Sequence, residues 1–268
     1  MRLRTLLRTA LAPALIAAAA LSAQTAQAAD GTPEPTAPST RIVGGGPASE
    51  TYSFMGSMQV QGRHGCGASL IKSQWMVTAA HCVAGQQPGN FRIRIGSNDH
   101  TSGGTLAGVS QIIRHPRYGQ VGPYDIALLR LSQPVANQPV AIAATSPAEG
   151  TATRLLGWGQ TCGTPGCGAA PRGLKQLDTR INPDRMCSTN FNSAVELCVY
   201  GGRTATACYG DSGGPALLKE GGTWRLAGAT SRAGANSQIC GTGDATVYTD
   251  VTAHQQWIAQ QTGGLRTS

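Results

Sequence analysis

The chain has 268 residues, of which 36 are glycine and only 13% are charged, and its formal net charge is +8. This length fits one large all-β unit or two small domains built around shared cores. The lysines and arginines are scattered, with no dense run and no interleaved aromatic residues, so a nucleic-acid partner is not expected.

The first 28 residues have the organisation of a signal peptide. Arginines at positions 2, 4 and 8 precede an apolar stretch at 11–21, and Ala-Gln-Ala at 26–28 provides an A-x-A cleavage site. A membrane anchor is not expected, because this stretch is shorter than the ~20 residues of a bilayer span and no later segment is apolar enough to cross. The sequence predicts a soluble protein that is secreted to the extracellular space.

Residues 29–41 are predicted to be an activation pro-segment. They are rich in proline, threonine and alanine and contain too little apolar surface to fold. The sequence Arg-Ile-Val-Gly-Gly lies at 41–45, and from there the composition changes to alternating apolar and polar residues.

Short β-strands are predicted from Phe54 onward. The segment 91–95 alternates strictly, which places Phe91, Ile93 and Ile95 on one face. Similar runs lie at 69–71, 75–79, 109–113, 126–131, 154–156, 176–181 and 224–229. Clusters of Gly, Pro, Asn and Ser separate the runs, a pattern typical of a β-sandwich or barrel.

One helix is predicted, near the C-terminus. Its apolar face is formed by Val251, His254, Trp257 and Ile258, and the glycines at 263–264 end it. The joint between two halves is placed at the Ser-Pro-Ala-Glu-Gly segment, residues 146–150, so the halves are predicted at 42–147 and 148–268.

The eight cysteines favour disulfides, because these form and persist outside the cytoplasm. Eight cysteines allow too many pairings for spacing alone to select one. A zinc site is not expected, because no two CxxC or CxH motifs occur at the spacing of metal ligands.

Three short segments contain the residue types of nucleophilic catalysis, in the order His, Asp, Ser. A histidine lies next to a cysteine in Thr-Ala-Ala-His-Cys at 78–82, an aspartate begins the apolar run 125–131, and glycines surround a serine at 210–215. Each segment alone also has an ordinary structural explanation, as a packed histidine, a strand cap or a tight turn. Their combination in this order predicts a catalytic site.

The chemistry explains why these residue types belong together. Ser212 becomes a nucleophile toward an amide when a base such as His81 takes its proton, and a carboxylate such as Asp125 holds that base in the right tautomer. The glycines beside Ser212 allow backbone N–H groups to converge on the oxygen that becomes negative.

On these motifs, the chain from Ile42 to its end resembles the chymotrypsin-type family of secreted serine peptidases, and among them a bacterial member. The matching segments are RIVGG at 41–45, TAAHC at 78–82, DIALLRL at 125–131 and GDSGGP at 210–215. The resemblance implies an all-β fold of two antiparallel β-barrels packed face to face, with a C-terminal helix outside. It places His81 and Asp125 on the first barrel, Ser212 on the second, and the active site in the cleft between them.

The resemblance also implies the roles of individual residues. His81 takes the proton of Ser212 and later gives it to the leaving amine, while Asp125 orients His81. The backbone N–H groups of Gly210 and Ser212 form the oxyanion hole. Ser231 hydrogen-bonds the buried acid and begins the strand that pairs with substrate.

The resemblance further orders the cysteines. The implied pairs are Cys66 with Cys82, Cys187 with Cys198 and Cys208 with Cys240, which leaves Cys162 and Cys167 to close a tight local loop. This last pair is not a common bridge of the family. The paired acids of the family's calcium loop are absent after Ile95, so no metal and no other cofactor is implied.

Cleavage after Arg41 is expected to activate the protein. In the family the new ammonium, here on Ile42, pairs with the acid before the catalytic serine, here Asp211. A buried Asp211 without a partner would be costly, so the ion pair and a formed oxyanion turn should appear together. The expected partners are an activating protease with arginine specificity and protein or peptide substrates, and the mature protein is expected to be a monomer.

Four residues fall at positions of the family's substrate pocket: Thr206, Ser231, Ala233 and Thr246. Thr206 stands where the trypsin-like branch has an acid, so a substrate Arg or Lys would be buried without a partner. The β-branched Thr246 narrows the pocket, as in the elastase branch. We therefore expect cleavage after small or medium apolar residues. A wider, chymotrypsin-like pocket is the alternative, and an Asp244 that reaches the pocket would restore specificity for basic residues.

A catalytically inactive homologue that acts as a binding module is the rival from another class. Such proteins typically lose the His or the Ser, whereas this chain keeps all three catalytic residues. An α/β hydrolase would need a G-x-S-x-G elbow and the order Ser, acid, His, which this chain lacks. The remaining histidines are expected to be surface or packing residues: His64, His100, His115 and His254.

Overall fold

The structure, a computed structural model, describes residues 44–119, 122–188, 190–203, 205–235 and 239–265. Arg41, Ile42 and the predicted signal peptide lie outside these ranges. Among the described residues, no helix is both long enough and apolar enough to cross a membrane.

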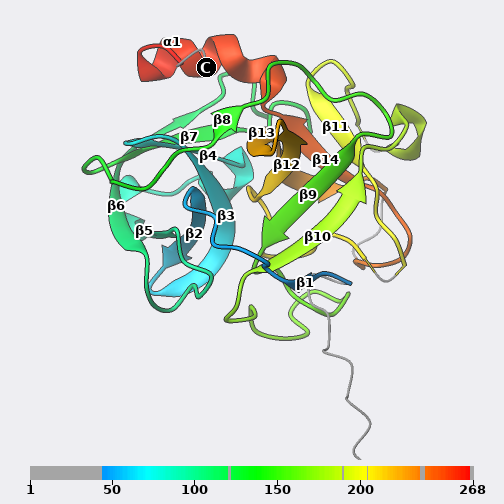
Figure 1. Ribbon diagram of the computed structural model, residues 1–268, viewed down its shortest axis with the longest axis horizontal. Helices are drawn as coiled ribbons and strands as arrows, with labels where there is room; N and C mark the ends of the chain where they lie inside the picture. The colour runs from blue at the N-terminus through cyan, green and yellow to red at the C-terminus, as the bar shows by residue number, and fades with distance from the viewer. Residues whose placement is uncertain (1–43, 120–121, 189, 204, 236–238, 266–268) are drawn as a thin grey trace, which may run out of the picture. The chain divides into compact units, whose positions relative to one another are not determined.

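The first half of the described chain is a closed barrel of six antiparallel strands, in the spatial order β2-β3-β4-β7-β6-β5 (Figure 1). Its strands are β2 (Met55–Val60), β3 (Arg63–Lys72), β4 (Trp75–Thr78), β5 (Phe91–Ile95), β6 (Thr105–Arg114) and β7 (Ala127–Leu131). The alternation at 91–95 decides which face is buried, because Phe91, Ile93 and Ile95 all lie in the core. The strand predicted there is confirmed with its orientation.

The second half is one eight-stranded sheet with the strand order β1-β10-β9-β12-β13-β14-β11, in which β8 pairs with β13. Its strands are β1 (Gly46–Pro47), β8 (Ala141–Ile142), β9 (Ala152–Gly157), β10 (Lys175–Arg180), β11 (Glu196–Val199), β12 (Pro215–Glu220), β13 (Thr223–Ala233) and β14 (Thr246–Asp250). An isolated antiparallel bridge between Ile181 and Val199 joins the end of β10 to β11. Because β10 lies near one end of the strand order and β11 at the other, this bridge brings the two ends of the sheet together. The predicted all-β fold of two antiparallel barrels is confirmed, with one parallel pair between β8 and β13.

Five strands of the second sheet have no counterpart among the predicted runs: the two-residue strands β1 and β8, and the longer strands β11, β12 and β14. Every residue of β11 and β14 is buried, and so are the first four residues of β12. A strand covered on both faces has no reason to alternate, so the two-residue period that revealed the other strands is missing here.

The C-terminal helix α1 (Gln255–Thr262) follows a short 3₁₀ turn and is shown in red in Figure 1. Of the predicted apolar face, Ile258 is buried in α1 and Trp257 is partly buried, whereas the buried Val251 and His254 lie just before the helix. Gly263 ends the helix in the left-handed region with φ of 72°, a conformation that glycine adopts without a Cβ penalty.

Four disulfides connect the described cysteines: Cys66–Cys82, Cys162–Cys167, Cys187–Cys198 and Cys208–Cys240. They are the three pairs that the family resemblance implies and the remaining local pair. The first joins β3 to the turn that follows β4, and the last joins two loops of the second half.

Candidate active site

Two neighbouring strands of the first barrel place an imidazole beside a carboxylate. Thr78 at the end of β4 pairs with Ala127 at the start of β7. His81 lies in the 3₁₀ turn just after β4 and Asp125 just before β7, so both are at the same end of this pair. Nδ1 of His81 lies 2.7 Å from Oδ2 of Asp125, and the backbone N–H of His81 donates to Oδ1 at 2.9 Å.

The second half of the protein holds the carboxylate from its other side. Oγ of Ser231 on β13 donates to Oδ2 of Asp125 at 2.7 Å, and Oγ1 of Thr249 on β14 donates to the backbone oxygen of Asp125 at 2.9 Å. Asp125 is buried. Because the carboxylate accepts a hydrogen bond from the N–H at Nδ1, the free lone pair of the His81 ring lies on Nε2, as a general base requires.

Ser212 reaches the site on a turn that precedes β12 and packs against the first barrel. The N–H of Gly67 donates to the backbone oxygen of Ser212 at 2.8 Å. A Cβ on Gly213 would lie 2.2 Å from Oγ1 of Thr78 and 2.5 Å from the oxygen of Gly67, and Gly213 has φ of 74°. Only glycine fits there, and this close contact sets the serine turn against the end of β4 that leads to His81.

Among the described residues, no hydrogen bond joins Oγ of Ser212 to Nε2 of His81. The structure thus makes the His81–Asp125 contact directly and brings the Ser212 turn to the same barrel end. Catalytic hydrogen bonds are often long in a substrate-free site and tighten when substrate binds.

The serine turn presents two free backbone donors. The N–H groups of Asp211, Gly213 and Gly214 donate to the backbone oxygens of Cys208, Thr230 and Asp211, respectively. The N–H groups of Gly210 and Ser212 have no acceptor among the described residues. They are therefore available to an oxygen that gains negative charge during a reaction.

His64 supports this turn, although the sequence predicted only a surface or packing residue there. Its Nε2 lies 2.9 Å from the backbone oxygen of Gly210, and its Nδ1 lies 2.8 Å from Oγ of Ser57. The ring also packs against Trp158, with 5.4 Å between centroids. Burial lowers the pKa of His64 to about 4, so near neutral pH the ring is uncharged and bonds to the Gly210 peptide. The pairing of β2 with β3 brings His64 to Ser57, and the sequence motifs contain no signal of it.

Asp211 is buried under the same turn. Its Oδ1 accepts the N–H of Gly159 and its Oδ2 accepts the N–H of Cys208, each at 2.8 Å. Burial raises the pKa of Asp211 to about 6, and these two donors oppose the shift. A Cβ on Gly157 or Gly159 would lie 1.9 Å or 2.2 Å from the carboxylate oxygens, so both glycines are needed to make room for it.

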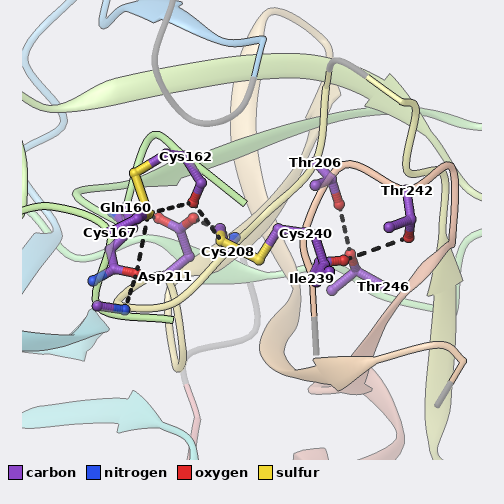
Figure 2. Close-up of a disulfide and its surroundings, with 12 residues drawn as sticks. Gln160, Cys162, Cys167, Thr206, Cys208, Asp211, Ile239, Cys240, Thr242 and Thr246 are labelled. Atoms are coloured by element: carbon purple, nitrogen blue, oxygen red, sulfur yellow. Dashed lines mark hydrogen bonds between the residues drawn. A yellow bond between two sulfur atoms is a disulfide. The ribbon is translucent and has the colours of Figure 1, made fainter. Parts of the chain in front are cut away.

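A cavity of about 130 Å³ opens beside Ser212 and contains all four predicted pocket residues: Thr206, Ser231, Ala233 and Thr246. Oγ1 of Thr206 lies 3.0 Å from Oγ1 of Thr246, and both threonines are buried (Figure 2). Asp244 also lines the cavity, and its carboxylate accepts the hydroxyl of Thr242.

The sequence from residue 42 to residue 258 matches the family model named Trypsin. The chain belongs to the trypsin family. Membership of this family supports a serine endopeptidase in general, and the site described above has the residue types of that chemistry. The four disulfides and the trypsin-family domain are typical of extracellular proteins.

One buried ion pair of this trypsin-family chain was not predicted from its sequence. Arg232, the residue after Ser231 on β13, pairs with both carboxylate oxygens of Glu196 on β11. The side chain of Glu196 is 0% exposed and that of Arg232 is 10% exposed. No sequence motif links these positions, because the contact depends on both strands pairing with β14.

Within the described part of the chain, the only cluster with metal-ligand spacing is Cys66, His81 and Cys82. Both sulfurs are committed to the Cys66–Cys82 disulfide, so His81 alone could act as a ligand.

Proposed function

We propose that this chain is a secreted serine endopeptidase that cleaves peptide bonds through an acyl-enzyme on Ser212. The observation that carries the proposal is the buried Asp125 carboxylate, which is bonded to Nδ1 of His81 and to Ser231 at 2.7 Å each. This arrangement leaves Nε2 of His81 as a base at the end of the barrel against which the Ser212 turn packs.

The reaction follows from these positions. Nε2 of His81 takes the proton of Oγ of Ser212 as Oγ attacks the scissile carbonyl carbon, and the imidazolium then gives that proton to the leaving amine. The N–H groups of Gly210 and Ser212 stabilise the oxyanion, a contribution worth about 10²–10³ in rate for one donor. Water attacks the ester in the same way and releases the peptide acid.

Labelling with an organofluorophosphate tests this function. The mature protein should be modified at Ser212, and the Ser212→Ala variant should be neither modified nor active on peptide amides. An inactive homologue that only binds partners would keep its partner but show no modification. A wild-type protein that folds and remains unlabelled would therefore refute the proposal.

We propose activation by cleavage after Arg41, with the ammonium of Ile42 as the partner of Asp211. The support is the burial of Asp211, to which the described residues donate two backbone N–H groups and no cation, because a carboxylate removed from water is costly to ionise until a cation joins it. N-terminal sequencing of active enzyme should give Ile-Val-Gly-Gly. Full activity of a chain that starts at Ala29 or Asp30 would contradict this.

We propose that the signal peptide at 1–28 directs secretion of the protein.

We also propose that the pocket accepts small or medium apolar residues. The hydroxyls of Thr206 and Thr246 contact each other in the wall of the cavity, where Thr206 stands in place of the acid of the trypsin-like branch, and the β-branched Thr246 restricts the width of the cavity. Peptide amides that differ only in the residue before the cut should be hydrolysed faster with Ala or Val than with Phe, Arg or Lys.

Asp244 favours one alternative, cleavage after basic residues, because it lines the same cavity. The variant Asp244→Asn decides between the two. If the pocket selects basic residues through this carboxylate, the change should remove activity on Arg and Lys substrates. If the pocket is apolar, the order of substrates should not change.

A further inference from the structure

The loop 160–168, which follows β9, connects the two sides of the proposed substrate pocket. On one side, the N–H of Gln160 donates to the backbone oxygen of Tyr209 at 2.6 Å. On the other side, the N–H of Cys240 donates to the backbone oxygen of Gly163 at 2.9 Å. Both Tyr209 and Cys240 line the cavity beside Ser212, so the loop contacts two parts of the cavity wall.

The contact with the second wall is close. A Cβ on Gly163 would lie 2.4 Å from the backbone oxygen of Cys240 and 3.1 Å from Cγ2 of Ile239. We call residues 239–241 the pocket rim, because all three line the cavity. A residue with a side chain at 163 would push the rim away or displace the loop.

The loop has no apolar core of its own, and its far half, residues 164–169, is exposed. Its shape depends on cross-links: the Cys162–Cys167 disulfide and the side-chain amide of Gln160. The amide nitrogen donates to the backbone oxygen of Gly168 at 3.1 Å, and the amide oxygen accepts the N–H of Gly166 at 3.2 Å. An exposed loop held in this way becomes mobile when its covalent link is opened.

The second disulfide, Cys208–Cys240, joins the pocket rim to the segment that binds the buried Asp211. Cys240 is bonded to the buried Cys208, whose N–H binds the carboxylate of Asp211. Sγ of Cys208 also lies 3.7 Å from the backbone oxygen of Cys162. The two disulfides therefore lie side by side, as Figure 2 shows. The Cys162–Cys167 bridge supports the pocket rim, and the Cys208–Cys240 bridge anchors it.

We propose that the Cys162–Cys167 bridge is a positioning device for substrate specificity: it fixes the loop 160–168 against the pocket rim and so sets the affinity for the residue before the cut. The inference rests on the proposed function, because it concerns the pocket of that same site. The loop contacts the rim rather than His81 or Asp125, so opening the bridge should weaken substrate binding while the bond-breaking step is retained.

Three variants test this inference. Cys162→Ser/Cys167→Ser opens the bridge, Gly163→Ala keeps the bridge but displaces the rim, and Gly173→Ala is the matched control. A Cβ at Gly173, on the same connection between β9 and β10, meets nothing within 4 Å. For each protein, kcat and KM are measured on Ala and Val peptide amides, with active enzyme counted by organofluorophosphate labelling.

The first two variants should raise KM by roughly tenfold, the size expected for loss of one hydrogen bond, and change kcat by less than about twofold. The control should match wild type. Unchanged KM in both variants would overturn the inference. A parallel fall of kcat and labelling would also overturn it, because the loop would then support the serine turn rather than the pocket.

Hydrogen exchange provides a readout that does not require activity. The amide of Cys240 should exchange faster in the first two variants than in the wild type and the control, and equal rates would count against the proposal. If the wild type is neither labelled nor active, the proposed function fails, whereas the exchange rate still decides whether the loop holds the rim.

Discussion

At the scale of single residues, Asp125 connects the two halves of the site. Its carboxylate receives His81 from the first barrel and Ser231 from the second sheet, and its backbone oxygen receives Thr249. Every one of these donors is on a different segment, so Asp125 fixes the imidazole and also ties the sheets together. A change at this residue should affect the imidazole tautomer first.

The variant Asp125→Asn should lower kcat by about 10⁴-fold, the drop known for the same change in related serine peptidases, because an amide favours the wrong tautomer of His81. Labelling of Ser212 should slow in parallel, while the melting temperature should remain close to wild type. A kcat within tenfold of wild type would show that Asp125 does not orient His81.

Thr246 is the residue whose change should alter specificity. The variant Thr246→Gly removes a β-branched side chain and the partner of Thr206, so kcat/KM for Phe substrates should rise by roughly tenfold relative to Ala substrates. The measurement is the ratio of the two kcat/KM values. An unchanged ratio would mean that another residue limits the size of the pocket.

At the scale of elements, β11 and β13 are joined by the buried pair of Glu196 and Arg232. Glu196 also accepts the N–H of Asn192 at 2.8 Å, and Arg232 donates to the backbone oxygen of Asn190 at 2.9 Å. The pair thus anchors the segment before β11 to the strand that carries Ser231. Each of the two charges offsets the desolvation cost of the other, because either charge alone would be costly in the interior.

The variant Arg232→Met should lower the free energy of unfolding by about 3–5 kcal/mol, since it leaves the carboxylate of Glu196 buried without its cation. Adding Glu196→Leu should restore much of this loss. Urea unfolding of the two single variants and the double variant measures the coupling. Additive losses would contradict the explanation.

His254, the residue just before α1, is buried against His115, Tyr124 and Trp257. Burial lowers the pKa of His254 to about 4, below the value of about 6.5 expected for the unfolded chain. The unfolded state therefore binds more protons between these values, and the contribution to stability falls as the pH drops from about 6.5 to 4. Asp211, whose pKa is raised, acts in the opposite direction over the same range.

Between pH 7 and pH 4, the free energy of unfolding should fall less in the variant His254→Leu than in wild type, by up to about 3 kcal/mol. The reason is that leucine takes up no proton on unfolding. Urea unfolding at both pH values, compared with wild type, isolates the contribution of His254. Identical pH dependence in the two proteins would refute this assignment.

At the scale of the whole molecule, the proposed pocket and the proposed activation site differ in the residue that precedes the cut. The proposed pocket has no acid at its base, whereas the proposed activation cut follows Arg41. Purified precursor should therefore not mature by itself, and an added arginine-specific protease should activate it. Self-activation that is lost in Ser212→Ala would contradict the proposed specificity, since an enzyme that cuts after Arg41 must accept arginine.

Local sequence was enough to predict the motifs, the alternating strands and the end of the helix. Each of the segments 78–82, 125–131 and 210–215 places a reactive residue beside the small residues or the strand that it needs. Strands such as β5 and the helix α1 have one buried face, so the periodicity of their apolar residues is visible in the sequence. These features depend only on neighbours along the chain.

The contacts between distant strands could not be predicted in this way and depend on the assembled sheets. The fully buried β11 and β14 have no alternation, and the roles of His64, Thr249 and the Glu196–Arg232 pair appear only in the folded protein. The contact of the Gly163 loop with the pocket rim is of the same kind. A periodic pattern reports which face of a strand is buried, whereas strand register and sheet packing decide which residues meet across that face.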